Sequence, residues 1–261
     1  MPFAAVNGQS LYYEDSGGDG PAVLFSHGFL MGHEMWSHQV AALADRYRVI
    51  AYDERGWGQS TFTAPFDYYD MAQDAVALLD HLGIDRAVFG GMSQGGFLAL
   101  RAAFKTPERV RALILVDTHA RTFTAEEQEG FGALFDSIEA TGWNEEMVAA
   151  LYGVLFAQGY TDPYWAGKWR SRPPSAIRPA RECLFARDDI TGRLGEITCP
   201  VLIVHGEDDA GIPISDGRAL EAGLPNVVGF CAVPGAGHSP NVEMPEIVNP
   251  AIRAFLDGLS T

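Results

Sequence analysis

Cysteine is scarce in this sequence. Only three are present among 261 residues, Cys183, Cys199 and Cys231, and their spacing matches no metal-binding motif. A small, odd number of cysteines argues against the disulfide framework of a compact secreted domain. None of the three stands in a recognisable nucleophile setting. We therefore expect reduced thiols in a cytoplasmic protein.

Long apolar runs and an excess of basic residues are also lacking. No uninterrupted apolar run approaches the roughly 18 residues that a membrane-spanning helix needs. The N-terminus shows no basic stretch followed by an apolar one, so we expect no signal peptide. Lysine and arginine number 18 against 34 acidic residues, for a formal net charge of −16. This excess of acid argues against binding to nucleic acid or to anionic membranes.

What the sequence does contain is a regular alternation of short apolar runs and helical patterns. This rhythm predicts an α/β fold, a mostly parallel, doubly wound sheet of about eight strands whose opening hairpin adds an antiparallel edge. The predicted strands are residues 3–6, 9–14, 22–25, 47–52, 86–89, 110–116, 200–205 and 227–233, and the predicted helices between them are 36–44, 69–82, 97–104, 214–222 and 244–259. In such sheets the reactive groups gather at the carboxyl ends of the strands.

The stretch Gly91-Met92-Ser93-Gln94-Gly95 follows one of these strands and precedes a helix. It matches Gly-x-Ser-x-Gly, the pattern of a serine at a tight strand-to-helix turn. Such a serine has a strained backbone, and the residues two positions away approach too closely to carry side chains. The turn exposes the serine hydroxyl and places the Gln94 N–H at a helix N-terminus. We predict that Ser93 is a nucleophile.

A serine hydroxyl needs a base within hydrogen-bond reach, and that base needs an orienting acid. His238 lies in a Gly-Ala-Gly-His loop after the last strand, and Asp209 lies in the loop after the preceding strand. The order Ser93, Asp209, His238 is the one expected of a triad on this kind of sheet. Asp117, at the end of an earlier strand, and Asp208 are the alternatives for the acid. The other histidines lack a glycine-rich strand-end setting, or, as with His205, adjoin the proposed acid.

The oxyanion of an acyl-transfer reaction needs two N–H donors. The Gln94 N–H is the first candidate. The Phe29 N–H, in the loop after the strand at residues 22–25, is the second, because Gly28 lets the backbone approach closely. We expect His27 to fix this loop and to take no part in proton transfer.

Residues 120–196 interrupt the alternation with several helices, at about 125–140, 145–158, 164–170 and 175–187, and with many aromatic side chains. We interpret this segment as a helical cap that fills its own core and also covers Ser93. Residues 1–119 and 197–261 would form the core. Trp143, Tyr152 and Trp165 are candidates for contact with substrate, although the sequence does not show which aromatic side chains face the pocket.

Taken together, these stretches resemble the α/β-hydrolase family along nearly the whole chain. The motifs that carry the resemblance are Ser26-His27-Gly28-Phe29, the loop from Asp53 to Ser60, Gly91-Met92-Ser93-Gln94-Gly95-Gly96, Gly206-Glu207-Asp208-Asp209 and Gly237-His238. The resemblance implies that Asp209 is the acid and that a helical cap follows the sixth strand. It assigns no catalytic role to the Asp53 to Ser60 loop. Met92 and Gln94, which flank Ser93, differ from the commoner Ser-Met-Gly sequence at this turn, the nucleophile elbow, and the sequence gives no reason for the difference.

Haloalkane dehalogenases and epoxide hydrolases, two other branches of the family, have an aspartate as the nucleophile. Because this chain has Ser93 at that position, we do not expect either activity. The chain looks most similar to bacterial carboxylesterases and 3-oxoadipate enol-lactonases. The resemblance implies a serine hydrolase of small carboxylic esters or lactones, working without metal or organic cofactor. The alternatives are a C–C bond hydrolase or a perhydrolase with the same triad, and a ligand receptor without turnover. The substrate itself and the oligomeric state have no signature in the sequence.

Overall fold

The computed structural model describes residues 2–62 and 65–259. Within these residues the strands are β1 (Phe3–Val6), β2 (Gln9–Asp15), β3 (Ala22–Ser26), β4 (Arg48–Tyr52), β5 (Ala87–Met92), β6 (Val110–Val116), β7 (Val201–Gly206) and β8 (Val227–Val233). They form one eight-stranded sheet in the order β1-β2-β4-β3-β5-β6-β7-β8. The pairs β1–β2 and β2–β4 are antiparallel and the remaining neighbours are parallel. The predicted fold class is confirmed.

The central strands are buried on both faces, as expected of a sheet covered by helices on each side. Every residue of β3, β5 and β7 is buried. The helices of the sheet region are η1 (His33–Trp36), α1 (Ser37–Leu43), α2 (Tyr68–His81), α3 (Gln94–Lys105), η2 (Pro107–Arg109), α8 (Ile214–Gly223), α9 (Pro240–Glu243) and α10 (Pro245–Gly258). Helices α2 and α3 pack against each other, and α1 packs against α10. The α3 helix begins at Gln94, earlier than predicted, because it starts directly at the tight turn.

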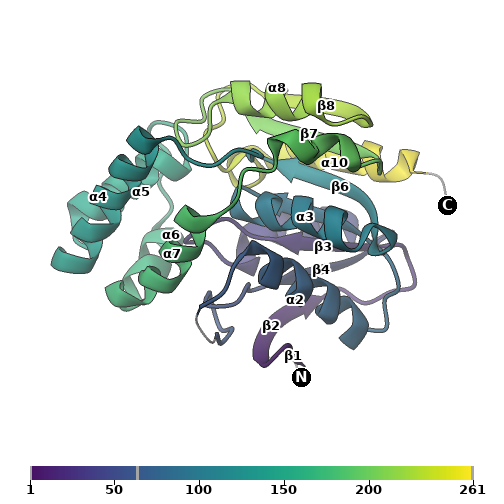
Figure 1. Cartoon of the computed structure of the whole chain (residues 1–261), viewed down its shortest axis with the longest axis horizontal. Coiled ribbons are helices and arrows are strands. Elements are labelled where there is room, and N and C mark those ends of the chain that lie inside the picture. Colours follow the sequence, from purple (N-terminus) through teal and green to yellow (C-terminus); the bar gives the residue numbers. More distant parts are fainter. Residues whose placement is uncertain (1, 63–64, 260–261) are drawn as a thin grey trace.

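Between β6 and β7 the chain forms a group of helices beside the sheet, on the left in Figure 1, followed by a short helix, η4 (Thr191–Glu196), that packs against α8. The helices of the group are α4 (Ala125–Thr141), α5 (Glu145–Leu155), α6 (Pro163–Arg170), η3 (Pro174–Ile177) and α7 (Arg178–Ala186). The start of α4 is fixed by a capping box, in which Thr124 and Glu127 each bind the other's backbone N–H. Among the described residues, none of these helices or any other is long and apolar enough to cross a membrane.

Candidate active site

Ser93 occupies the turn between β5 and α3 with φ 50° and ψ −112°, a conformation that side chains normally disfavour. A Cβ at position 91 would lie 2.1 Å from the Gly95 oxygen, and a Cβ at position 95 would lie 2.3 Å from the Ser26 oxygen. Side chains at either position would therefore clash with the backbone. The glycines two residues before and two residues after Ser93 are therefore required by the close approach of the backbone, as the sequence motif predicts.

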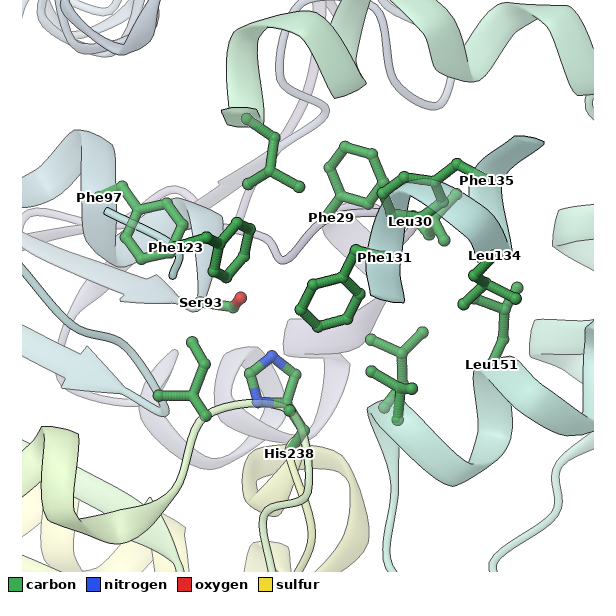
Figure 2. A pocket seen from close by; sticks show the side chains of 15 residues that line it. Phe29, Leu30, Ser93, Phe97, Phe123, Phe131, Leu134, Phe135, Leu151 and His238 are labelled. Atoms are coloured by element: carbon green, nitrogen blue, oxygen red, sulfur yellow. The ribbon is translucent and has the colours of Figure 1, made fainter. Parts of the chain in front are cut away.

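Three further predicted site residues lie at the carboxyl ends of parallel strands. Phe29 follows β3, Asp209 follows β7 and His238 follows β8. The strands β3, β5, β6, β7 and β8 are parallel and follow one another in the sheet, so these loops meet at one edge of it. Figure 2 shows Ser93 and the His238 ring reaching into the same cavity from different elements.

The Asp209 carboxylate orients His238. Its Oδ2 lies 2.7 Å from His238 Nδ1, and its Oδ1 accepts the N–H groups of Gly211 and Ile212 at 2.7 and 2.9 Å. Burial opposes ionisation of Asp209, but the His238 ring and these N–H donors outweigh it and hold the Asp209 pKa below its usual value. With Nδ1 engaged, the Nε2 atom of His238 is the ring nitrogen left for Ser93.

The two alternative acids do not contact His238 in this way. Asp208 is exposed. Asp117 is fully buried at the end of β6, where its Oδ1 accepts the Gly206 N–H at 2.9 Å. Burial and the adjacent Asp209 carboxylate raise the pKa of Asp117 well above its usual value, which favours the neutral carboxyl. The structure therefore pairs His238 with Asp209.

Among residues 2–62 and 65–259, two groups of side chains bring together residue types that bind metals: Asp117 with His205 and Asp209, and His33 with Glu34 and Asp53. Most of these ligand atoms already have protein partners. His205 Nε2 donates to the Ile212 oxygen at 2.9 Å, and Glu34 pairs with Lys168. Asp117 Oδ2 and His205 Nδ1 have no hydrogen-bond partner among the described residues, so these contacts satisfy the first group only in part.

His27 fixes the loop that contains Phe29. Its Nε2 accepts the Glu54 N–H at 3.0 Å, so its proton lies on Nδ1, which donates to the Gly28 oxygen at 2.8 Å. Burial lowers the pKa of His27 to about 4, so the ring is neutral near pH 7. A neutral ring with both nitrogens bonded holds the backbone in place and has no free position for proton transfer.

Glu243 also positions the site, although no motif singled it out. Its carboxylate accepts the N–H groups of Gly237 and Ser239, on either side of His238, at 3.2 and 3.0 Å. It also accepts the Ala157 N–H at 2.7 Å, from the segment that follows α5. One carboxylate thus ties the His238 loop to the helical segment above it. Glu243 follows His238 closely in the sequence, so its contact with the His238 loop could have been anticipated. Its contact with Ala157 could not, because that contact depends on the tertiary fold.

The cavity beside Ser93 encloses about 530 Å³ of empty space, counting the part that opens to solvent. The space that the centre of a water molecule can reach is only about 50 Å³, so the cavity is narrow. Its lining is Phe29, Leu30, Ser93, Phe97, Phe123, Phe131, Leu134, Phe135, Leu151, Val154, Leu155, Leu184, Gly211, Ile212 and His238.

The three aromatic side chains expected to contact substrate are not in this lining. Trp143 Nε1 donates to the Arg172 oxygen, and Tyr152 donates to the Asp162 oxygen. Trp165 is buried against Phe156. They hold the helical segment together, and the cavity wall is formed by phenylalanines and aliphatic residues. The expectation failed because the apolar periodicity of a helix shows which side chains are buried, but not which neighbour buries them.

The chain belongs to the α/β hydrolase fold family, whose model matches residues 21–245. It is 31% identical over 232 residues to 3-oxoadipate enol-lactonase 1 of Acinetobacter baylyi, covering 87% of this chain and 85% of the relative. It is 33% identical to a RutD protein of Variovorax paradoxus named as a carbamate hydrolase, covering 96% and 97%. Its fold matches a thermophilic esterase of Thermogutta terrifontis with a TM-score of 0.86 and 32% identity, covering 100% and 98%. The chain is therefore a hydrolase of the α/β fold.

Proposed function

We propose that this protein hydrolyses small carboxylic esters or lactones through an acyl-enzyme on Ser93. The observation that carries the proposal is the hydrogen-bonded Asp209–His238 pair placed in one cavity with a serine on a strained turn. The relatives named as an esterase and an enol-lactonase support this reaction class. The relative named as a carbamate hydrolase supports attack on a carbonyl carbon more generally.

In the first half of the proposed cycle, Ser93 Oγ attacks the carbonyl carbon while His238 Nε2 takes the hydroxyl proton. The Phe29 and Gln94 N–H groups stabilise the negative charge that develops on the carbonyl oxygen. Asp209 stabilises the imidazolium that forms. His238 then gives the proton to the departing alkoxide, and the C–O bond of the ester breaks.

In the second half, His238 Nε2 takes a proton from a water molecule, whose oxygen attacks the acyl-enzyme carbonyl. The bond to Ser93 Oγ breaks, the serine recovers its proton from His238, and the carboxylic acid leaves. Every proton is accounted for by the side chains of this chain, so the proposed cycle needs no metal or organic cofactor.

The test is intact-mass analysis after treatment with a fluorophosphonate, on the wild type and on Ser93→Ala. This reagent needs no assumption about the natural substrate. One adduct on the wild type that is absent from the variant would support an activated Ser93, and hydrolysis of an ester and lactone panel by the wild type alone would support the reaction. A folded wild type that forms no adduct and cleaves no ester would contradict the proposal.

A further inference from the structure

Among the residues that the structure describes, none with a permanent charge lines the cavity beside Ser93. Of the fifteen residues that line it, Ser93 and His238 are the polar ones, and the others are apolar side chains and one glycine. Figure 2 shows phenylalanine rings surrounding the serine hydroxyl on several sides. An ionised group bound there would lose its hydration without gaining a partner of opposite charge.

The phenylalanines form a continuous wall. The ring centroids of Phe29 and Phe135 lie 5.2 Å apart, those of Phe135 and Phe131 lie 6.3 Å apart, and those of Phe131 and Phe123 lie 5.1 Å apart. Rings that pack on one another hold their positions and present their faces or edges to the cavity. Because the cavity is also narrow, it leaves little room for water to accompany a charge.

A guanidinium lies behind this wall but is engaged elsewhere. Arg187 is 3.9 Å from the Phe123 ring centroid and 4.5 Å from that of Phe97. Its donors bind the Leu184 oxygen at 2.9 Å and the His119 ring at 3.2 Å. The rings separate this cation from the cavity, so it cannot form a hydrogen-bonded pair with a substrate carboxylate.

We propose that the part of the substrate enclosed by this cavity is uncharged and apolar, so that the protein acts on neutral esters or lactones and rejects analogues with a carboxylate there. This inference rests on the proposed function and adds a substrate class to it. It separates this chain from hydrolases whose substrates carry a free carboxylate next to the reacting group.

The test compares two esters of equal acyl chain length, ethyl butanoate and monoethyl succinate, with the wild-type protein. We expect kcat/KM to favour the butanoate by at least about 1000-fold, because burying an unpaired carboxylate is strongly unfavourable. The matched variants are Leu134→Arg and Leu134→Gln, at a half-buried position on α4 that lines the cavity. The arginine should raise kcat/KM for the succinate at least about 10-fold above that of the glutamine variant.

Comparable rates for the two esters in the wild type would overturn the inference and leave the proposed function standing. Failure to cleave either ester, or any other member of the ester and lactone panel, would defeat the proposed function and this inference with it. A strong butanoate preference that narrows with Leu134→Arg, and not with Leu134→Gln, would support the inference.

Independently of the cavity, Glu54 connects the two loops that carry the proposed oxyanion donors. Its carboxylate accepts a hydrogen bond from the Gln94 side chain, and its backbone N–H donates to His27 Nε2 at 3.0 Å. The Tyr68 hydroxyl donates to the other end of the Gln94 amide at 3.3 Å. Glu54 is 1% exposed, and burial raises its pKa well above the usual value, which favours a neutral carboxyl.

We infer that the Glu54 side chain positions the oxyanion hole by holding the Gln94 side chain and with it the Gln94 N–H, while the Glu54 backbone N–H holds His27 beside the Phe29 loop. This inference also rests on the proposed function. It gives a physical reason for the glutamine in the elbow, because an apolar side chain at position 94 would leave the buried Glu54 carboxyl without its donor.

The test measures kcat and KM separately, with unfolding temperature, for Glu54→Gln, Glu54→Leu and the double variant Glu54→Leu/Gln94→Met. We expect Glu54→Gln to stay within about 3-fold of wild type. Glu54→Leu should lose about 10- to 100-fold in kcat with KM nearly unchanged, because misplaced donors weaken transition-state binding. The double variant should recover most of the loss, since it replaces a polar pair by an apolar one.

A Glu54→Leu variant that folds and keeps the wild-type kcat would refute the positioning role. So would a double variant that folds with no better kcat than Glu54→Leu. A loss of activity that appears in KM alone would also count against it, because it would show a change in substrate binding and not in the oxyanion hole.

Discussion

The strained backbone at Ser93 predicts that two inactive variants differ in stability, with Ser93→Gly more stable than Ser93→Ala. Its φ of 50° and ψ of −112° are the mirror image of an extended conformation, which is open to glycine and unfavourable for any residue with a Cβ. Ser93→Ala keeps the strain, whereas Ser93→Gly removes it. Both variants lack the hydroxyl, so they differ only in the strained Cβ.

The expected difference follows from two opposing contributions. Relief of a strained backbone is worth about 1–3 kcal/mol. The greater freedom of glycine in the unfolded chain costs about 0.5–1 kcal/mol. The side chain points into the cavity, so removing the Cβ forfeits little packing. We expect Ser93→Gly to be more stable than Ser93→Ala by about 1 kcal/mol, or roughly 2–4 °C in Tm for a chain of this size.

Urea and thermal unfolding of the two variants measure this difference. Ala149→Gly is the matched control, because Ala149 is exposed in the middle of α5, where the same exchange should cost about 1 kcal/mol. The sign of the alanine-to-glycine effect should therefore reverse between positions 93 and 149. If Ser93→Gly proved no more stable than Ser93→Ala while the control behaved as expected, the strain argument would fail.

The remaining predictions concern residues around the serine. Asp209→Asn should lower kcat by about 10⁴-fold, because an amide favours the wrong His238 tautomer, while Asp208→Asn should leave kcat unchanged in the same steady-state assay. His27 has a folded pKa of about 4 against 6.5 unfolded, so its contribution to stability is present above pH 6.5 and is lost as pH falls toward 4. In urea unfolding, the free energy of unfolding of the wild type should fall between pH 7.5 and pH 5 by about 2 kcal/mol more than that of His27→Gln. An equal fall in both proteins would contradict this assignment. Glu243→Ala orphans three N–H groups and should cost at least about 2 kcal/mol of unfolding free energy together with about 10-fold in kcat, and a variant matching wild type in both would show that Glu243 does not position His238.

Much of the fold could be predicted because its signals are local. Strands such as β3 and β6 are mostly apolar runs, and the helices α2 and α3 end just before Gly83 and Pro107. The Gly-x-Ser-x-Gly spacing pointed to a particular turn, and the order of Ser93, Asp209 and His238 pointed to particular loops. Parallel strands bring such loops to one edge, so the topology made the juxtaposition predictable.

Contacts between distant segments could not be predicted in the same way. Glu54 and Gln94 are forty positions apart, and Glu243 and Ala157 are 86 apart, with no pattern in the chain linking either pair. The same limit explains the cap aromatics. Trp143 and Phe131 have similar apolar character, and only the packing of the helices decides that Phe131 faces the cavity while Trp143 holds the segment together.

The sequence by itself determined the α/β architecture and the residue types available for catalysis, because backbone sterics and hydrophobic periodicity act over a few residues. The tertiary structure decided which carboxylate orients His238, which phenylalanines enclose Ser93, and that Glu54 and Glu243 hold the surrounding loops. These outcomes depend on the approach of segments far apart in the chain. They are set by the close packing of the whole molecule, in which each side chain is placed by neighbours that its own sequence context does not specify.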